Sequence, residues 1–161
     1  MVLVISMIYE VLNQLNIPYE EMKHIPVYTV EEAESLHLTI DGVGCKNLFL
    51  KNEKGSYYLV FMADDKRADL KKIAESVDCK KVRFAGTDEL MNILHLEKGS
   101  VTPLGIIHDK ERQVFLVIDA ELVGSKVLMH PLRNDRTISI GFDDFLKFIE
   151  FTNHEYSIMK M

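Results

Sequence analysis

The sequence has few of the residues from which metal and redox sites are built. It contains two cysteines, Cys45 and Cys79, and they form no CxxC pair. Its histidines show no HxxxH spacing, so we expect no zinc or iron centre. A phosphate-binding loop of the form GxxxxGK[ST] is also missing, which argues against nucleotide hydrolysis. We therefore expect a protein that needs no metal ion or other cofactor.

Long apolar runs and an excess of positive charge are also lacking. The apolar start, Met1 to Ile8, has neither the basic region nor the cleavage site of a signal peptide, and Glu10 ends it well short of a membrane span. We expect a soluble, cytoplasmic protein with reduced cysteines and no membrane partner. The net charge of -6 argues against general nucleic-acid binding, to DNA included, but not against a small basic patch that holds the end of an RNA.

The composition is otherwise that of one globular domain, which we expect to span residues 1–161, with 47% apolar residues. Apolar residues at helical spacing predict a helix over 5–15 that stops at Asn16. Further helices are predicted at 29–38, 70–77 and 87–96, with a last one after 141–144. Strands are predicted at 19–23, 46–51, 57–62, 105–107, 114–118, 127–129 and 137–140. This irregular alternation predicts an α+β fold, in which helices pack on a mixed β-sheet.

Residues 46–51, Lys-Asn-Leu-Phe-Leu-Lys, form the first strand of the clearest predicted hairpin. Alternation puts Lys46 on the apolar face with Leu48 and Leu50, and Asn47 on the other face. An ammonium there must reach solvent, pair with an anion or lose its proton. Lys46 is therefore either a lysine whose stem lies on apolar surface or a partner for a phosphate or carbonyl oxygen. Neighbouring Cys45 is interpreted as a small packing residue rather than a nucleophile.

Residues 99–103, Gly-Ser-Val-Thr-Pro, read as a loop stiffened by proline. Gly99 would let a ligand approach the backbone, and the loop N–H groups would be free to bind it. An ordinary connecting loop is the alternative. His130 precedes a proline and Asn134 follows in a polar turn, so this histidine is either a hydrogen-bonded structural residue or part of a site.

Taken together, these segments resemble the YbaK-like, prolyl-tRNA-synthetase-associated domain family, and the resemblance extends over essentially the whole chain. It implies that Lys46, Gly99 and Pro103 are catalytic. It implies that the residues that bind the substrate are Asn47, Ser100, Val101, Thr102, His130 and Asn134. Asp135 and Arg136 stand where the family often has small or hydroxyl residues.

Within that family the chain looks most like free-standing proteins that clear alanine from proline tRNA. The resemblance implies a trans-editing deacylase that binds the acceptor end of mischarged tRNA and could associate with prolyl-tRNA synthetase. A water molecule, assisted by a ribose hydroxyl, would attack the ester, which fits a chain without a Ser or Cys triad. Cysteine or serine on tRNA is an alternative target, and a non-catalytic module that binds the tRNA end is an alternative function. The expected candidates for the walls of the amino-acid pocket are Val27, Val30, Leu36, Phe49 and Phe61.

Overall fold

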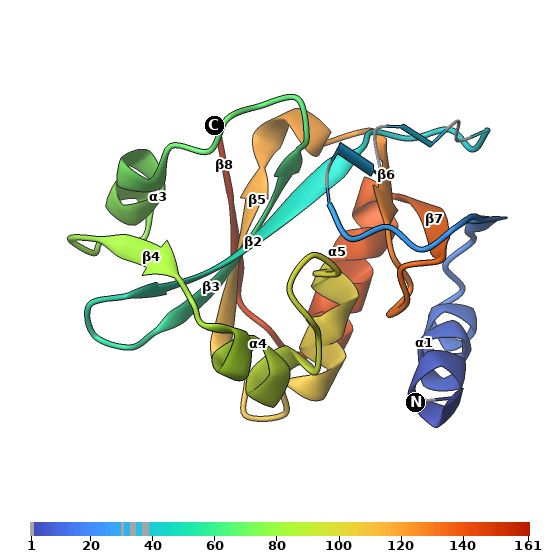
Figure 1. Ribbon diagram of the computed structural model, residues 1–161, viewed down its shortest axis with the longest axis horizontal. Coiled ribbons are helices and arrows are strands. Elements are labelled where there is room, and N and C mark those ends of the chain that lie inside the picture. The colour runs from blue at the N-terminus through green and yellow to red at the C-terminus, as the bar shows by residue number, and fades with distance from the viewer. Residues whose placement is uncertain (1, 30, 33–34, 37–38) are drawn as a thin grey trace.

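The computed structural model describes residues 2–29, 31–32, 35–36 and 39–161 (Figure 1). Its helical elements are α1 (Val2–Gln14), α3 (Leu70–Ser76), α4 (Thr87–Leu94), α5 (Phe142–Phe151) and the 3₁₀ turns η1 (Pro103–His108) and η2 (Ala120–Leu122). Its strands are β1 (Glu20–Lys23), β2 (Cys45–Asn52), β3 (Tyr57–Ala63), β4 (Val82–Phe84), β5 (Val114–Asp119), β6 (Lys126–Met129), β7 (Arg136–Gly141) and β8 (Tyr156–Met159).

The strands form two sheets rather than one. The larger has the order β4-β2-β3-β5-β8, with β2 antiparallel to β3 and with β5 parallel to both β3 and β8. The smaller is antiparallel, in the order β1-β7-β6. An isolated bridge between Val43 and Val127 joins the entry to β2 with β6. The prediction of an α+β fold with a mixed sheet is confirmed, whereas the division into two sheets was not predicted.

The two faces of the larger sheet are covered differently. On one face, Phe49 and Phe61 join a core to which both sheets and α5 contribute, and the rings of Phe61 and Phe145 lie 4.9 Å apart. On the other face, Leu50 and Met62 pack with Ile73 of α3. The alternation predicted for β2 is therefore confirmed, and Lys46 belongs to the face that carries Leu48 and Leu50.

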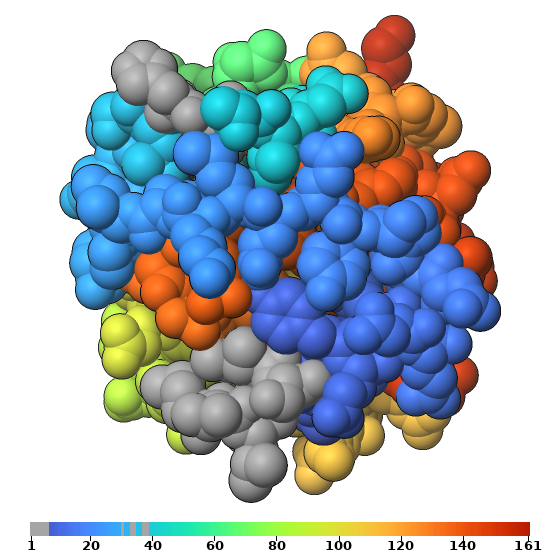
Figure 2. Space-filling view, turned by 90° about the vertical axis from the view of Figure 1, so that its right-hand side faces the viewer, coloured from blue at the N-terminus to red at the C-terminus, as the bar shows by residue number. Residues whose placement is uncertain are grey.

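The N-terminal segment closes one side of the molecule. In α1 the side chains of Ile8, Val11 and Leu12 are buried, and Asn16 takes a left-handed conformation, with φ 56°, where the chain leaves the helix. The chain then runs as β1 along β7. Figure 2 shows this N-terminal segment lying across the strands that follow residue 126. The predicted helix and its stop at Asn16 are confirmed.

Three local predictions fare differently. The strand predicted at 105–107 is wrong, because those residues belong to η1, which Thr102 caps by accepting a hydrogen bond from Leu104 N. The strands β4 and β8 were not predicted; both are short, lie at the edges of the sheet and are partly exposed. The helix predicted at 29–38 lies partly outside the described residues, but Thr29 Oγ1 accepts a hydrogen bond from Glu32 N at 3.0 Å, as expected for its N-cap.

Candidate functional site

A cavity of about 330 Å³ lies where β2 meets the smaller sheet and the loop that begins at Gly99. Among the described residues, six separate parts of the chain line it, and three of these parts contain residues that the sequence analysis selected as catalytic or substrate-binding. The lining residues are Val27, Tyr28, Thr29, Gly44, Cys45, Lys46, Asn47, Leu48, Asp64, Gly99, Val101, Leu128, Met129, His130 and Thr137. Lys46, Asn47, Gly99, Val101 and His130, which come from distant parts of the chain, thus share one cavity.

Lys46 lies near the start of β2 and lines the cavity. Its ammonium group is held in place by another part of the chain. Its Nζ donates a hydrogen bond to the carbonyl oxygen of Lys66. The Lys66 side chain is fixed in turn, since its Nζ lies 2.7 Å from Glu121 Oε2 and 3.0 Å from Asp119 Oδ1. Asp119 is fully buried and also accepts hydrogen bonds from Ala63 N and Glu121 N. The turn after β3 is therefore a fixed support for the Lys46 ammonium.

Asn47 leaves β2 on the opposite face from Lys46 and also lines the cavity. Its Oδ1 is buried, and among the described residues no group donates a hydrogen bond to it. A buried amide oxygen without a donor costs about 1–3 kcal/mol, so such atoms usually meet a donor that is not part of the chain. A ligand hydroxyl or ammonium group in the cavity can be that donor.

In the loop after α4, the space at Gly99 and the N–H group of Ser100 are both occupied by other parts of the chain. Gly99 has φ +88°, and a Cβ at this position would lie 2.2 Å from the carbonyl oxygen of Tyr28. The space that the missing side chain leaves is thus filled by the Tyr28 backbone, which differs from the expected approach of a ligand. Ser100 N is also occupied, since it donates to Glu97 O at 3.1 Å. Gly99 instead lets the segment at Tyr28 pack against the loop.

Thr102 and Pro103 lie behind the cavity and are not among its lining residues. Thr102 is buried, and its hydroxyl donates to the carbonyl oxygen of His130 at 2.7 Å. Pro103 is buried at the first position of η1, where its missing N–H is not needed. In this structure these two residues connect the loop to His130 and fix where the loop ends.

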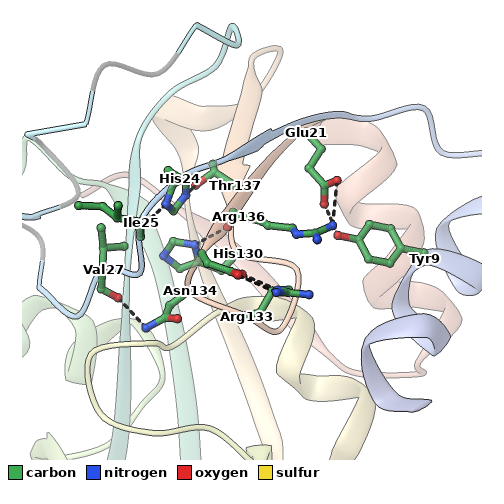
Figure 3. A network of polar contacts seen from close by, with 11 residues as sticks. Tyr9, Glu21, His24, Ile25, Val27, His130, Arg133, Asn134, Arg136 and Thr137 are labelled. Atoms are coloured by element: carbon green, nitrogen blue, oxygen red, sulfur yellow. Dashed lines mark hydrogen bonds and ion pairs between the residues drawn. The ribbon is translucent and has the colours of Figure 1, made fainter. Parts of the chain in front are cut away.

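His130 follows β6, and Figure 3 shows its ring beside that of His24. His130 Nδ1 lies 2.9 Å from the carbonyl oxygen of Arg136; because a carbonyl only accepts, Nδ1 carries the proton and Nε2 is the acceptor of the neutral ring. Burial lowers the pKa of His130, and the nearby His24 adds to this effect. The neutral ring therefore presents a hydrogen-bond acceptor at the cavity.

Asn134 supports the site without lining the cavity. Its Nδ2 donates to Val27 O at 3.1 Å, and Val27 N donates to Asn134 O at 3.1 Å. These two bonds, drawn in part in Figure 3, tie the turn after His130 to the segment that carries Tyr28. Asp135 and Arg136 also have partners within the chain: Arg133 Nη2 donates to Asp135 Oδ2 at 2.6 Å, and Arg136 Nη1 lies 3.5 Å from Glu21 Oε2.

The walls of the cavity differ from the candidates chosen from the sequence. Val27 lines it, but Phe49 and Phe61 are buried in the core between the sheets and Leu36 is not among the lining residues. Val30 lies outside the described residues. The apolar walls that the sequence analysis missed are Leu48, Leu128 and Met129. Alternation alone could not find them, because it does not reveal which end of a strand faces a cavity.

Cys45 is the only lining residue with a thiol, and it is a poor nucleophile. Burial raises its pKa to about 12, and the charges of Asp64 and Asp119 act in the same direction. Its Sγ donates to Val43 O at 3.2 Å. The thiol therefore stays protonated, and the interpretation as a packing residue is supported. Within the described residues no group of His, Cys, Asp and Glu could hold a metal ion.

A second and larger cavity, of about 740 Å³, lies at the opposite end of the larger sheet between β3, the end of α3 and the loop at 111–113. None of the residues selected from the sequence lines it. The smaller cavity contains an ammonium, a neutral imidazole, an amide and one carboxylate among apolar walls. That arrangement can bind a polar, partly charged ligand and stabilise negative charge on one of its oxygens, so the smaller cavity is the candidate site.

Comparisons with known proteins bear on the family to which the chain belongs. The family model described as aminoacyl-tRNA editing domain matches residues 24–148. The chain is 35% identical over 152 residues to the Prolyl-tRNA editing protein ProX of Acetoanaerobium sticklandii, covering 93% of each chain. It is 35% identical over 148 residues to the Prolyl-tRNA synthetase associated domain-containing protein 1 of Danio rerio, covering 90% of this chain and 80% of the relative.

Among solved structures, one described as a candidate trans-editing enzyme for prolyl tRNA synthetase matches the fold with a TM-score of 0.70. The match covers 98% of this chain and 97% of that one at 20% sequence identity, so it bears on the fold alone.

Proposed function

Because the chain belongs to the aminoacyl-tRNA editing domain family, we propose that it is a trans-editing deacylase that hydrolyses the ester of mischarged tRNA, with alanine on proline tRNA as its substrate. The observation that carries this proposal is the meeting of Lys46, Asn47, Val101 and His130 in one cavity. The acceptor end of the tRNA is its partner, and it acts in the cytoplasm, where charged tRNA is used. Association with prolyl-tRNA synthetase is part of the same proposal.

The hydrolysis needs no nucleophile from the chain. Water attacks the ester carbonyl carbon, and the bond from that carbon to the ribose oxygen breaks. The ribose oxygen takes up the proton that the water loses. In this proposal the Lys46 ammonium stabilises negative charge on the carbonyl oxygen or the adjacent phosphate, because it is fixed in position before the substrate binds. Neutral His130 accepts a hydrogen bond from a ribose hydroxyl or from the attacking water. Gly99 and Pro103 contribute by holding the loop, Ser100 by its backbone hydrogen bond to Glu97, and Thr102 by the hydrogen bond that ties the loop to His130.

The dimensions of the cavity favour a small amino acid. About 330 Å³ lies at the lower end of the range for ligand sites, and it must also take part of the terminal ribose. Val27, Leu128 and Met129 can contact a methyl group there. A synthetase pocket made for proline discriminates against alanine by only about 1–3 kcal/mol for each missing methylene, so a second, smaller sieve is needed.

The test is release of labelled amino acid from alanyl- and cysteinyl-charged proline tRNA. We expect rapid release of alanine, and a loss of roughly 100-fold or more in kcat/KM for Lys46→Ala, the size of effect seen when one stabilising donor is removed from an active site. The matched control is Lys51→Ala, at the other end of β2, where Lys51 pairs with Glu89 outside the cavity. Release of cysteine alone would show that the substrate is cysteine on proline tRNA. Release of neither amino acid by a folded protein would favour a module that binds the tRNA end without catalysis.

A further inference from the structure

Of the residues that the structure describes, Asp64 is the one acidic side chain that lines the cavity, and neither its residue type nor its spacing drew attention to it in the sequence. It follows β3 directly, and its N–H donates to the carbonyl oxygen of Gly44 at 3.0 Å, which extends the hairpin by one residue. Its carboxylate lies over Gly44: a Cβ on that glycine would be 2.4 Å from Asp64 Oδ2. The glycine thus makes room for the carboxylate at the entry to β2.

The Asp64 carboxylate takes part in no ion pair with the residues that the structure describes, although Lys46 and Lys66 both lie nearby in the fold. The Lys46 ammonium is directed to the Lys66 carbonyl oxygen, and the Lys66 ammonium is directed to Asp119 and Glu121. A half-buried carboxylate in a cavity with apolar walls favours a cation that the ligand supplies.

Asp64 and Lys46 are placed to bind two groups of one small ligand. Lys46 pairs with Met62 in the hairpin, so Asp64 is its diagonal neighbour on the same face of the sheet. Diagonal neighbours of this kind lie about 7–8 Å apart, within reach of long side chains. An aminoacyl ester carries a positively charged α-ammonium group next to its carbonyl, with the phosphate of the terminal nucleotide close by. Its positive and negative ends match the carboxylate and the ammonium in the cavity.

We propose that Asp64 is the subsite that binds the α-ammonium group of the aminoacyl ester, an inference that rests on the function proposed above. A carboxylate can also bind a vicinal diol, but in an aminoacyl ester one hydroxyl of the terminal ribose is esterified and the diol is lost. A subsite that binds the α-ammonium group favours esters that carry it over esters whose nitrogen is acylated. It therefore lets the enzyme remove alanine while it spares tRNA that carries a growing peptide.

The experiment compares two esters of proline tRNA that differ in one group. Alanyl-tRNA carries the α-ammonium group, and lactyl-tRNA, made from it by deamination with nitrous acid, carries a hydroxyl of similar size. Both are measured below pH 7, where an α-amino group of ordinary pKa, about 7.7–8.0, is protonated. The variants are Asp64→Asn, which keeps the shape of the side chain, and Asp65→Asn as the matched control, since Asp65 is exposed and does not line the cavity.

We expect Asp64→Asn to lower kcat/KM for alanyl-tRNA about 10- to 100-fold, the equivalent of one lost charge-assisted hydrogen bond, and to change lactyl-tRNA hydrolysis little. Asp65→Asn should leave both rates as in the wild type. The two esters differ in spontaneous hydrolysis, but this difference cancels when the ratio of the two rates is compared between wild type and variant. Hydrolysis of lactyl-tRNA also reports that Asp64→Asn is folded.

Two results would reject the subsite while leaving the enzyme in place. In the first, Asp64→Asn lowers the rates for alanyl-tRNA and lactyl-tRNA by the same factor. In the second, it lowers neither rate, although the wild type hydrolyses alanyl-tRNA. If the wild type hydrolyses neither ester, the proposed function itself is rejected, and the subsite with it.

Discussion

At the scale of single residues, Gly99 is the position where one backbone contact controls the shape of the site. Its φ of +88° disfavours any side chain, and the Tyr28 carbonyl oxygen fills the space where a Cβ would lie. Gly55 has nearly the same φ, +85°, but nothing lies within 4 Å of the Cβ position. Substitution at Gly55 therefore tests backbone strain alone, whereas substitution at Gly99 tests the same strain together with the contact to Tyr28.

We expect Gly55→Ala to lower the free energy of unfolding by about 1–2 kcal/mol, the cost of a left-handed conformation for a residue with a Cβ. Gly99→Ala should cost more and should also lower kcat/KM about tenfold or more, because the Tyr28 segment that lines the cavity must move. Urea denaturation and alanyl-tRNA hydrolysis measure the two effects. Equal costs and unchanged hydrolysis in both variants would show that the contact with Tyr28 does not matter.

His130 gives a prediction for the dependence of stability on pH. Burial lowers its pKa below the ordinary value of 6.5, and burial has the same effect on His108. Just below pH 6.5 the unfolded chain therefore binds protons that the folded protein does not, and stability falls as the pH falls. We expect the free energy of unfolding to decrease from pH 7 to pH 5, and to decrease less steeply in His130→Gln. Urea midpoints at several pH values test this, and identical slopes for the two proteins would contradict it.

At the scale of elements, α1 and the β2–β3 hairpin are the parts that the sequence predicts best. Helix α1 buries one face and exposes the other, so its helical spacing of apolar residues is visible without knowledge of its neighbours. The two hairpin strands are covered on both faces, and what marks them in the sequence is two apolar runs separated by a polar turn that contains glycine. The edge strands β4 and β8 have three and four residues, too few to show a period. Residues 105–107 are apolar for a different reason: η1 is buried, and an apolar run of that length does not distinguish a strand from a helical turn.

Helix α1 contributes buried side chains to the core that it shares with strands β6 and β7 of the smaller sheet. Leu12 is fully buried in the shared core, whereas Asn13 next to it is exposed. We expect Leu12→Ala to lower the free energy of unfolding by about 2–5 kcal/mol through lost apolar burial and the cavity it leaves. Asn13→Ala, the matched control, should stay within about 0.5 kcal/mol of the wild type. Thermal or urea unfolding measures both, and a small effect of Leu12→Ala would mean that α1 adds little to the core.

At the scale of the whole molecule, the acidic charge limits how the chain can hold an RNA. With a net charge of -6, contacts to phosphates must be few and local, as expected for a protein that binds only the end of a tRNA. No helix of the described residues is long and apolar enough to cross a membrane.

The salt dependence of tRNA binding tests this view. If two or three phosphates of the single-stranded end are neutralised, the logarithm of the binding constant should fall against the logarithm of salt concentration with a slope of about -1.4 to -2.1. Binding of proline tRNA at several salt concentrations measures the slope. A slope steeper than about -5 would indicate a broad basic surface on the body of the tRNA and would contradict a contact limited to its end.

The sequence by itself determined the features that depend on near neighbours in the chain: the α+β class, the alternation of β2 and the face on which Lys46 lies. The resemblance to a family selected His130 and the loop at Gly99. Only the tertiary structure decided that the Tyr28 backbone fills the space at Gly99, that Lys66 and Asp119 hold Lys46, and that Asp64 enters the cavity. These contacts join residues up to about 70 positions apart or depend on a turn that has no period, so no local pattern in the sequence records them.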